Sequence, residues 1–398
     1  MAKPVYSLTQ IIDQIDSGAS WSGNTITFAT PDSAPDSSSE GLGFVAMTDH
    51  MKTMAAAAFQ LWDDLIAPSI TKVTSGADIN FAYSSNTGDS TYTSSTYGGS
   101  SGGRIQMMGS DVWLASTWTS HNTDDAVQWT TYGFMTYLHE IGHALGLDHP
   151  GNYNGNATYA TDAVYAQDTH RYTLMSYFDG DADGSATKWY SKDGVWHYPA
   201  TPMLDDVATI QSIYGADTTT RTGNTVYGFH SNAGRDVFDF SKNTSPVVTI
   251  WDAKGKDTID LSGFSGKETL DLHAGMYSSV GGLTNNLAIA FGAVIENGIG
   301  GSGNDTIEGN AYANKLTGGA GADHLYGRIG NDTLVGGAGN DILDGGKGTD
   351  TVVYVHDQSQ YKITHSGDTT FVKDLTGGGT DTLLNDERIA FHDHTVLL

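Results

Sequence analysis

The sequence contains no cysteine among its 398 residues. Disulfide bonds therefore cannot stabilise this fold, whichever redox compartment the protein occupies. A pro-segment that blocks a metal ion through a thiolate is excluded for the same reason.

Positive charge is also scarce, because 19 Lys and Arg stand against 46 Asp and Glu, which gives a net charge of −27. A surface this acidic repels phosphate backbones and anionic membranes, so we do not expect nucleic-acid binding. The same charge suits divalent cations. Taken alone, it is equally typical of a merely soluble or halophilic surface.

Long apolar runs are missing as well. No stretch reaches the roughly 18 apolar residues that a membrane-spanning helix needs. Residues 1–16 lack both a basic start and an apolar run, so no Sec-type signal peptide is visible. If the protein is exported, we expect it to use a signal other than an N-terminal one.

What the chain does contain changes along its length. Residues 1–215 contain seven of the eight tryptophans and most of the predicted helices. Beyond about residue 220 the sequence predicts short strands and is rich in Gly, Asp and Asn. This change predicts two domains, residues 1–215 and 216–398, each with its own core.

Three helices are predicted in the first part. Apolar residues at three- and four-residue spacing predict a helix over residues 40–66. A second is predicted over residues 132–145, with Gly146 as a left-handed stop. A third begins at residues 201–202 and ends at Gly215.

Strands of a sheet are predicted between the first two helices. Alternating apolar and polar residues indicate strands over 79–83, 104–108 and 112–115. Residues 84–103 are rich in Ser, Thr and Gly, and we expect them to form an exposed loop.

The second part contains a nine-residue repeat. Residues 300–353 read GGSGNDTIE, GNAYANKLT, GGAGADHLY, GRIGNDTLV, GGAGNDILD, GGKGTDTVV. Position six is Asp in five copies and Asn314 in the second. A flexible Gly/Asp linker would not keep this period, so we expect the units to stack through one apolar residue each. Position eight supplies those residues: Ile307, Leu316, Leu325, Leu334, Leu343 and Val352.

A metal-binding pattern lies in the second predicted helix. Residues 139–149 read HEIGHALGLDH. His139 and His143 are one turn apart on one helix face, and Gly146 reverses the chain so that His149 can return as a third ligand. Three imidazoles leave one zinc position for a water molecule of lowered pKa.

Glu140 is placed to act on that water. It follows the first ligand directly, and as general base it would take the water's proton and pass it to the leaving nitrogen. The alternative without a metal is an amphipathic helix with surface histidines. It does not explain why Gly146 and His149 follow His143 at these fixed distances in the sequence. The other eleven histidines have no comparable spacing, and we interpret them as surface or packing residues.

The repeats predict calcium sites. Their glycines allow turns whose carbonyls point inward, and alternate turns stack on one edge, so that two turns can enclose one Ca²⁺ with a carboxylate. Calcium is then a folding requirement. The second copy of the repeat, with Asn310, Tyr312 and Asn314, should bind calcium poorly or differently. Arg328 replaces a glycine, which a carbonyl ligand tolerates if the turn is not left-handed there. The predicted ligands are Gly301, Gly303, Asp305, Gly319, Gly321, Asp323, Arg328, Gly330, Asp332, Gly337, Gly339, Asp341, Gly346, Gly348 and Asp350.

Together these motifs resemble the serralysin family of bacterial metalloproteases. The similarity rests on HEIGHALGLDHPGNYN, on the LMSYF segment at residues 174–178 and on PMLDDVATIQSIYGA, TRTGNTVYGF, WDAKGKDTIDLSG and IENGIGGSGND. LMSYF resembles the Met-turn of metzincins. The resemblance implies an α+β metzincin zinc-protease domain, a twisted sheet plus long helices, followed by an all-β parallel β-roll.

The resemblance also implies roles for individual residues. His139, His143 and His149 would hold zinc, and Met175 would form an apolar floor beneath them. Tyr177 would ligate the metal in some states and otherwise donate to the oxyanion. A strand near residues 104–116 would form the cleft edge and bind an extended substrate. Two earlier calcium sites would use Arg221, Gly223, Thr225, Asp252, Gly255, Asp257 and Glu296.

The function implied is that of a secreted, extracellular endopeptidase that cuts proteins and peptides with broad specificity and needs one Zn²⁺ and several Ca²⁺. It would be a monomer exported by a type I (ABC) exporter, although Thr395 stands where such chains often carry Asp before three final apolar residues. An alternative is a calcium-binding adhesion or surface protein with an inactive peptidase domain. Another metzincin, such as an astacin-like enzyme, is a third interpretation.

Overall fold

The computed structural model describes residues 3–88 and 90–398. The chain forms two compact units. Unit 1 comprises residues 1–190, 195–220 and 247–251, and unit 2 comprises residues 191–194, 221–246 and 252–398.

Unit 1 contains the α-helices of the described chain. Helix α4 carries two of the predicted metal ligands. It ends at Ala144, and Gly146 follows with φ 98°, which is the predicted left-handed stop. The predicted third helix is confirmed as α6. The helices are α1 (Leu8–Ile15), α2 (Ser39–Leu42), α3 (Asp49–Asp63), α4 (Tyr132–Ala144), α5 (Tyr159–Asp162) and α6 (Leu204–Tyr214).

The helix predicted over residues 40–66 is wrong in its first third. The chain instead forms α2 and the short strand β3 before α3 begins at Asp49, capped by the Thr48 hydroxyl. Gly43 ends α2 where a Cβ would lie 2.5 Å from the Asn86 side chain. Residues 44 and 45 then pair with β5 and so do not continue the helix.

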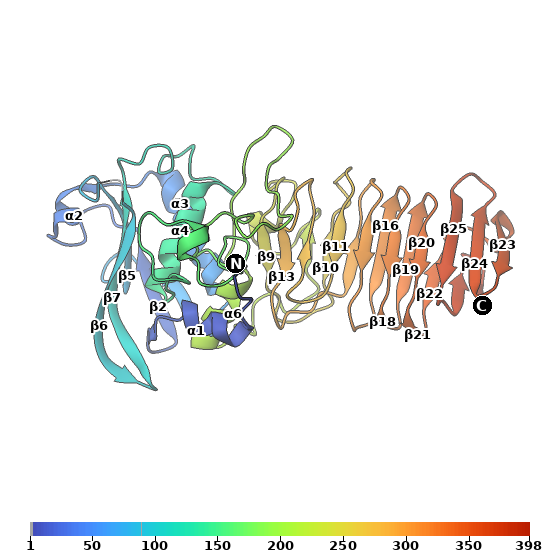
Figure 1. The fold of residues 1–398 in the computed structure, drawn as a ribbon, viewed down its shortest axis with the longest axis horizontal. Coiled ribbons are helices and arrows are strands. Elements are labelled where there is room, and N and C mark those ends of the chain that lie inside the picture. Colours follow the sequence, from blue (N-terminus) through green and yellow to red (C-terminus); the bar gives the residue numbers. More distant parts are fainter. Residues whose placement is uncertain (1–2, 89) are drawn as a thin grey trace. The chain divides into compact units, whose positions relative to one another are not determined.

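The sheet of unit 1 has seven strands in the order β1-β7-β5-β2-β4, with β3 paired to β5 and β6 paired to β7. The pairs along this path are parallel, whereas β3 and β6 run antiparallel to their partners. Figure 1 shows β6 and β7 as a long curved hairpin. The strands are β1 (Ala19–Ser20), β2 (Thr25–Ala29), β3 (Phe44–Val45), β4 (Ser69–Lys72), β5 (Ile79–Ser84), β6 (Tyr92–Ser101) and β7 (Arg104–Ala115).

The prediction of a loop over residues 84–103 is therefore wrong for β6. This strand pairs only with β7 among the described residues, and most of its side chains are exposed. Its Ser, Thr and Gly composition reflects that exposure. The two predicted segments 104–108 and 112–115 are one strand, β7.

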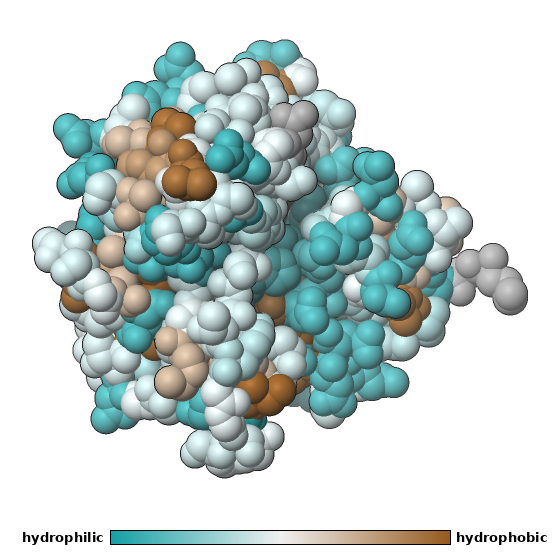
Figure 2. Space-filling view, turned by 90° about the vertical axis from the view of Figure 1, so that its left-hand side faces the viewer, coloured by the Kyte–Doolittle hydropathy of each residue, from teal (hydrophilic) through white to brown (hydrophobic). Residues whose placement is uncertain are grey.

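Aromatic side chains hold α3 and α4 against the sheet. The Phe59 ring of α3 stacks on Phe28 of β2, with ring centroids 3.9 Å apart. Tyr137 of α4 meets Phe81 of β5 edge to face, and its hydroxyl lies 2.7 Å from that of Tyr83. Each buried ring contributes about 1.5–3 kcal/mol through the hydrophobic effect, so α4 sits on a rigid base. Figure 2 shows a molecular face that is mainly polar, with small separate apolar patches.

Unit 2 is built from stacked, mostly parallel short strands (Figure 1). One sheet has the order β27-β26-β22-β19-β16-β14-β10-β8 and the other β11-β15-β17-β20-β25-β24-β23. The first contains β8 (Val226–Gly228), β10 (Thr258–Asp260), β14 (Asn297–Ile299), β16 (Lys315–Ala320), β19 (Thr333–Ala338), β22 (Thr351–Val353), β26 (Arg388–Ala390) and β27 (Thr395–Leu397). The second contains β11 (Thr269–Asp271), β15 (Thr306–Glu308), β17 (His324–Tyr326), β20 (Ile342–Asp344), β23 (Tyr361–Ser366), β24 (Thr369–Asp374) and β25 (Gly379–Leu384).

The nine-residue repeats alternate between these two sheets, as predicted. Ile307 pairs with Leu325 and then Leu343 in one sheet, while Leu316 pairs with Leu334 and then Val352 in the other. All six are at most 1% exposed. One coil of the roll is therefore two repeats, or 18 residues, long.

Antiparallel strands and short pairs complete this unit. β23, β24 and β25 form a meander, and β27 pairs antiparallel with β26. The fold class predicted from sequence, a domain of helices and sheet followed by an all-β domain of mostly parallel strands, is thus confirmed. The remaining elements are β9 (Val248–Ile250) in unit 1, and β12 (Tyr277–Ser278), β13 (Leu287–Ile289), β18 (Ile329–Gly330), β21 (Lys347–Gly348), η1 (Asp236–Phe238) and η2 (Gln358–Gln360) in unit 2.

Within the described residues, no helix combines the length and the apolar character needed to cross a bilayer.

Candidate metal centre

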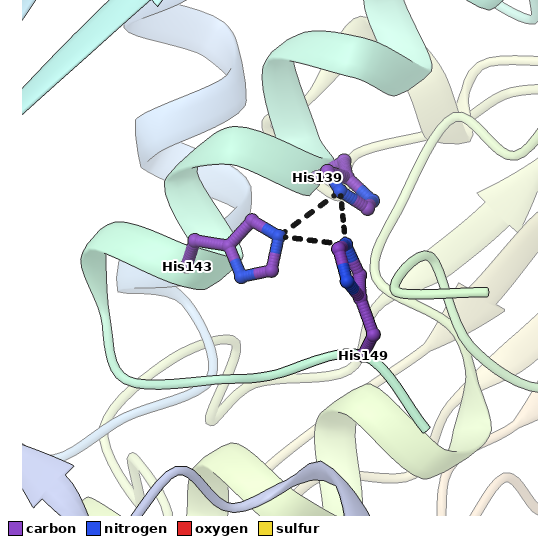
Figure 3. A group of neighbouring side chains, drawn as sticks. All are labelled: His139, His143 and His149. Atoms are coloured by element: carbon purple, nitrogen blue, oxygen red, sulfur yellow. Dashed lines mark hydrogen bonds between the residues drawn. The ribbon is translucent and has the colours of Figure 1, made fainter. Parts of the chain in front are cut away.

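Three imidazoles converge at the end of α4, as the spacing predicts. The Nε2 atom of His143 lies 3.1 Å from Nε2 of His139 and 3.1 Å from Nε2 of His149, and the third separation is 3.4 Å (Figure 3). Helix α4 places the first two one turn apart, and the reversal at Gly146 returns the third. A Cβ at Gly146 would lie 2.4 Å from the Ala19 carbonyl oxygen, so only glycine fits this turn.

The opposite ring nitrogens all have carbonyl partners. Nδ1 of His139, His143 and His149 lies 2.8, 2.9 and 3.0 Å from the carbonyl oxygens of Leu174, Leu147 and Tyr153, respectively. Donation of Nδ1–H to a carbonyl leaves the lone pair on Nε2, which is the tautomer that binds a metal. Sequence spacing did not reveal these carbonyls, which lie on loops.

Burial keeps the three rings neutral. Desolvation holds the pKa of His139 well below its usual value, lowers that of His143 to about 4 and lowers that of His149. Neutral imidazoles are the form that ligates zinc. Three convergent, neutral and oriented nitrogen donors fit a zinc ion.

Glu140 is buried beside this cluster and lines the same cleft. Burial raises the pKa of its carboxyl to about 7, while a hydrogen bond from Thr93 acts in the opposite direction. The Thr93 Oγ1 atom lies 2.8 Å from Glu140 Oε2 and 2.9 Å from the Glu140 carbonyl oxygen. A carboxyl with a pKa near neutrality is suited to accept and return a proton. Thr93 was missed because it lies in the segment predicted as a loop.

We expect Thr93→Val to lower kcat/KM by about tenfold, the usual worth of one hydrogen bond to a charged group. The acid limb of the pH profile should move to higher pH, because the bond lowers the pKa of Glu140. Thr96→Val is the matched control, since Thr96 lies on the same strand as Thr93 but its hydroxyl donates to the Gly109 carbonyl of β7 and not to Glu140. Equal pH profiles for the two variants would contradict the role of Thr93.

Met175 lies in the turn at residues 174–178, where it is fully buried and packs against α4. A Cβ at Gly142 of α4 would lie 2.8 Å from its sulfur atom. Asp206 of α6 fixes this turn, because its carboxylate accepts from the Leu174 N–H at 2.7 Å and the Thr173 hydroxyl at 2.6 Å. The sequence placed Asp206 in the first turn of a helix but did not indicate this contact.

Tyr177 stands next to the imidazoles, with its ring centroid 4.6 Å from that of His149 and 6.0 Å from that of His139. Its hydroxyl is 3.5 Å from Asn154 Oδ1. Burial raises the pKa of this hydroxyl, so it is a proton donor at neutral pH. The expected proximity of Tyr177 to the metal ligands is present.

The cluster opens into a cleft of about 610 Å³ lined mostly by polar groups. Strand β6 contributes Tyr92, Thr93, Ser95 and Tyr97 to its wall, and Thr91 directly before the strand also lines it. The expectation that residues 104–116 form the cleft edge is wrong, because β7 is enclosed between β6 and the strands β5 and β1. The edge strand is β6.

In unit 2 the repeat carboxylates form a regular ladder. The backbone N–H of Asp305 donates to Asp323 Oδ1 at 2.8 Å, and that of Asp323 donates to Asp341 Oδ1 at 2.9 Å. On the other edge Asp332 N–H donates to Asp350 Oδ1 at 2.8 Å. Each Oδ1 atom thereby binds the residue one coil earlier.

The second carboxylate oxygen of four aspartates in this ladder accepts no hydrogen bond within the described residues. Oδ2 of Asp323, Asp332, Asp341 and Asp350 is buried and has no hydrogen-bond partner within the described part of the chain. Burial raises the pKa of Asp323 to about 7 and of Asp332 to about 6. Buried carboxylate oxygens without partners are costly unless a cation binds them.

Carbonyl oxygens lie beside these carboxylates. A Cβ at Gly318 would be 2.4 Å from Asp323 Oδ2 and 2.6 Å from the Gly336 carbonyl oxygen. A Cβ at Gly327 would be 2.5 Å from both Asp332 Oδ2 and the Gly345 carbonyl oxygen. The first glycine of the repeat therefore faces the carboxylate, whereas the sequence prediction considered only the glycines two and four residues before it.

Those predicted glycines lie under the carbonyls of the preceding coil. A Cβ at any of them would come within 2.4 Å of a carbonyl oxygen, so each position requires glycine for close stacking. The set comprises Gly301, Gly303, Gly319, Gly321, Gly330, Gly337, Gly339, Gly346 and Gly348.

Arg328 departs from expectation. Its φ is 77°, so the turn is left-handed there, contrary to the condition under which we expected arginine to be tolerated. A non-glycine residue in this region costs about 1–2 kcal/mol. The side chain compensates through an ion pair with Glu308 and by lying over the Tyr326 ring.

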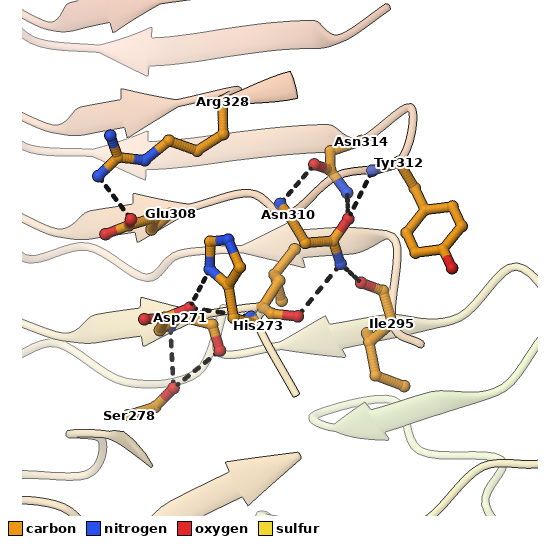
Figure 4. Close-up of polar contacts among 10 residues, drawn as sticks. Asp271, His273, Ser278, Ile295, Glu308, Asn310, Tyr312, Asn314 and Arg328 are labelled. Atoms are coloured by element: carbon orange, nitrogen blue, oxygen red, sulfur yellow. Dashed lines mark hydrogen bonds and ion pairs between the residues drawn. The ribbon is translucent and has the colours of Figure 1, made fainter. Parts of the chain in front are cut away.

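The second copy of the repeat carries Asn314 at the carboxylate position and Asn310 at a glycine position, and both amides donate to nearby carbonyls. Asn310 Nδ2 donates to the carbonyls of Leu272 at 3.1 Å and Ile295 at 2.8 Å (Figure 4). Asn314 Nδ2 donates to the carbonyl of Glu296 at 2.9 Å. These donors occupy oxygens that a cation would otherwise need.

The earlier predicted ligands are also brought together. Gly255 lies between the Gly223 carbonyl and the Asp257 carboxylate, where a Cβ would be 2.3 and 2.4 Å from an oxygen of each. Asp257 Oδ1 accepts from the Thr225 N–H, and Glu296 Oε2 accepts from the Asp257 N–H. Two further members take other contacts: Asp252 Oδ2 accepts from the Tyr227 hydroxyl, and the Arg221 guanidinium lies over the Tyr227 and Phe238 rings.

Sequence reasoning missed the C-terminal continuation of the ladder. Asp341 N–H donates to Asp381 Oδ1 at 3.0 Å, and Asp350 N–H donates to Glu387 Oε2 at 2.7 Å. Both oxygens of Asp386 are buried without a hydrogen-bond partner in the described chain, and burial raises its pKa to about 8. Residues 376–384 read TGGGTDTLL, which keeps Gly, Gly, Asp and Leu at positions two, four, six and eight of the repeat, and this signal could have identified Asp381.

Comparisons with known proteins cover both units. Residues 20–171 match the matrixin family of M10 peptidases, and residues 216–391 match the C-terminal domain of M10 serralysins. The relatives include metallopeptidase AprA of Pseudomonas marginalis, 38% identical over 334 residues, and metalloprotease AprA of Pseudomonas entomophila (strain L48), 40% identical over 339 residues. Serralysin A of Dickeya chrysanthemi is 38% identical over 323 residues.

These matches cover 79%, 79% and 77% of this chain, and 67%, 66% and 64% of the three relatives. The chain thus spans about two thirds of their length. The similarity includes the histidine cluster on α4 and the roll. The chain belongs to the serralysin family of zinc metallopeptidases.

Proposed function

We propose that this protein is a secreted zinc endopeptidase that hydrolyses peptide bonds of other proteins with broad specificity, and that calcium stabilises its roll. The observation that carries the proposal is the convergence of three Nε2 atoms within 3.4 Å of one another next to the buried carboxyl of Glu140. Family membership supports the same activity.

In this proposal His139, His143 and His149 hold one zinc ion, which supplies Lewis-acid polarisation of the scissile carbonyl and a lower pKa for water. Glu140 accepts the proton of the attacking water and donates it to the leaving nitrogen. The pKa near 7 that burial gives Glu140 favours both transfers. Tyr177 donates its hydroxyl proton in a hydrogen bond to the developing oxyanion.

The substrate would bind along β6. As an edge strand, β6 has backbone N–H and C=O groups that no strand of the described chain occupies on one side. An extended peptide can pair with these groups, and the cleft lies directly beside them. Pairing through the backbone does not depend on the side chains of the substrate, and this agrees with broad specificity.

We propose several calcium ions in the roll. Support comes from the partnerless Oδ2 atoms of the ladder and the adjacent glycine carbonyls, because a carboxylate and carbonyl oxygens are the ligands that Ca²⁺ prefers. The turn at Asn310 and Asn314 should bind none, since its amides already satisfy the carbonyls. The ligand set proposed from sequence is extended by Asp381, Asp386 and Glu387.

The remaining assignments rest on family resemblance. We propose residues 1–215 as the catalytic domain and residues 216–398 as the calcium-binding and secretion domain. The protein would be exported by a type I (ABC) exporter and act outside the cell as a monomer.

Casein digestion tests the proposal. We expect cleavage by the purified protein in calcium buffer, loss of more than about 99% of the rate after removal of the zinc with a zinc-selective chelator, and recovery when zinc is returned. Calcium in excess throughout keeps the roll intact. A protein that holds stoichiometric zinc but leaves casein and a mixed peptide library uncut would be an inactive peptidase, as the adhesion interpretation requires.

A further inference from the structure

A second group of metal-type donors lies in unit 2 and is not part of the carboxylate ladder. Asp271 ends β11 and pairs in register with Glu308, which ends β15. His273 follows two residues after Asp271. One ligand atom from each of these three side chains lies within 4.8 Å of the others. The sequence analysis treated His273 as a surface or packing residue, and its spacing gave no other indication.

The backbone holds these residues in place. The Leu272 N–H donates to the Glu308 carbonyl at 2.9 Å, which fixes one strand end against the other. The Asp271 N–H donates to Ser278 Oγ at 2.9 Å, and the His273 N–H donates to Asp271 Oδ1 at 2.9 Å. The donors are therefore set on paired strands and a closed turn.

The side chains point into one space (Figure 4). His273 Nδ1 lies 2.7 Å from Asp271 Oδ1. Arg328 lies on the other side of Glu308, and its guanidinium is 2.5 Å from Glu308 Oε1. The side chains of Asp271, His273 and Glu308 are 17%, 41% and 31% exposed, so an ion from solvent can reach them.

We propose that Asp271, His273 and Glu308 form a second transition-metal site, selective for Zn²⁺ over Ca²⁺. An imidazole with two carboxylates is a donor set that zinc accepts, whereas calcium prefers oxygen ligands alone. The two carboxylates also leave one negative charge after pairing with Arg328. The site would bind the ion through these three side chains and complete its coordination with water.

Arg328 is a competitor for this ion. Its guanidinium neutralises Glu308 when no metal is bound, so binding must displace or weaken that ion pair. A bound ion would link β11 and β15, whose donors Asp271 and Glu308 are 37 residues apart in the sequence. It would therefore stabilise two successive turns of the roll without taking part in peptide cleavage.

Zinc binding to the full-length protein tests the site. The protein is first saturated with calcium and loaded with one equivalent of zinc, and further zinc is then titrated by calorimetry and equilibrium dialysis. We expect one additional ion per chain. His273→Ala and Glu308→Gln should each weaken the binding of this ion by at least about tenfold, with unchanged casein digestion.

His230→Ala is the matched control. His230 Nδ1 lies 2.9 Å from Asp260 Oδ2, but no third metal-type donor joins this pair within the described residues. The His230→Ala variant should bind the additional zinc ion as tightly as the wild type does. A second comparison uses Arg328→Gly, which releases Glu308 and suits the positive φ, and Arg328→Lys, which keeps the charge.

The two Arg328 variants should differ in their affinity for the additional zinc ion. We expect Arg328→Gly to bind the additional zinc about two- to fivefold more tightly, as loss of a surface ion pair implies, and Arg328→Lys to resemble the wild type. The site is refuted if wild-type protein takes up no additional zinc, or if His273→Ala and Glu308→Gln bind it as tightly as His230→Ala. It is equally refuted if calcium displaces the additional zinc at comparable concentration.

Discussion

Glu140→Ala is expected to lower the turnover of a peptide substrate by about three orders of magnitude, within the range for loss of a general base. Zinc content should remain at the wild-type level, because the three histidines keep their carbonyl partners at 2.8–3.0 Å. Turnover is measured with a fluorogenic peptide, and zinc by elemental analysis of the same sample.

Glu140→Gln sharpens this experiment. Glutamine fills the same volume and can still contact Thr93, but it cannot accept a proton from water. It should be as inactive as alanine and fold at least as well, because the wild-type carboxyl is buried, which raises its pKa to about 7. More than about a tenth of wild-type turnover with full zinc content would contradict the assignment of Glu140 as general base.

Removal of calcium is expected to unfold the roll. A site with a dissociation constant one hundredth of the calcium concentration adds about 2.7 kcal/mol to the free energy of unfolding. About four such sites equal the whole stability of an ordinary domain, about 5–15 kcal/mol. Circular dichroism should show loss of β-structure after a calcium-selective chelator is added, with recovery on return of calcium.

The same loss should depend on pH. Burial raises the pKa values of Asp257 and Asp323 to about 7, and those of Asp332 and Asp381 to about 6. Acids whose pKa is higher in the folded state stabilise the fold while protonated, and this stability is lost as pH rises through the folded pKa. The calcium-free roll should therefore be more stable near pH 4 than near pH 8. A calcium-free roll with the opposite pH trend, or unchanged spectra at pH 8, would contradict the calcium sites.

Short-range order explains what the sequence predicted well. The three zinc ligands lie within eleven residues, so helix geometry and one glycine bring their side chains together. The roll was predicted because its 18-residue coil is a multiple of the nine-residue period. In both cases the relevant contacts repeat at fixed sequence distance.

Long-range contacts explain what it predicted poorly. Strand β6 exists through its pairing with β7, and its exposed Ser and Thr residues give no apolar alternation. The contact of Thr93 with Glu140 depends on that pairing. Asp381 and Glu387 extend the carboxylate ladder at distances of 40 and 37 residues, because the β23–β24 hairpin interrupts the period.

The carboxylate ladder also gives the roll a polarity. Each aspartate accepts the backbone N–H of the residue one coil before it, so these side-chain hydrogen bonds all run from one coil to the coil that follows it. Loss of Asp341 would thus deprive Asp323 of its acceptor, whereas loss of Asp323 leaves the acceptor of Asp341 in place. Loss of one carboxylate from such an array is therefore expected to weaken first the coil on its N-terminal side.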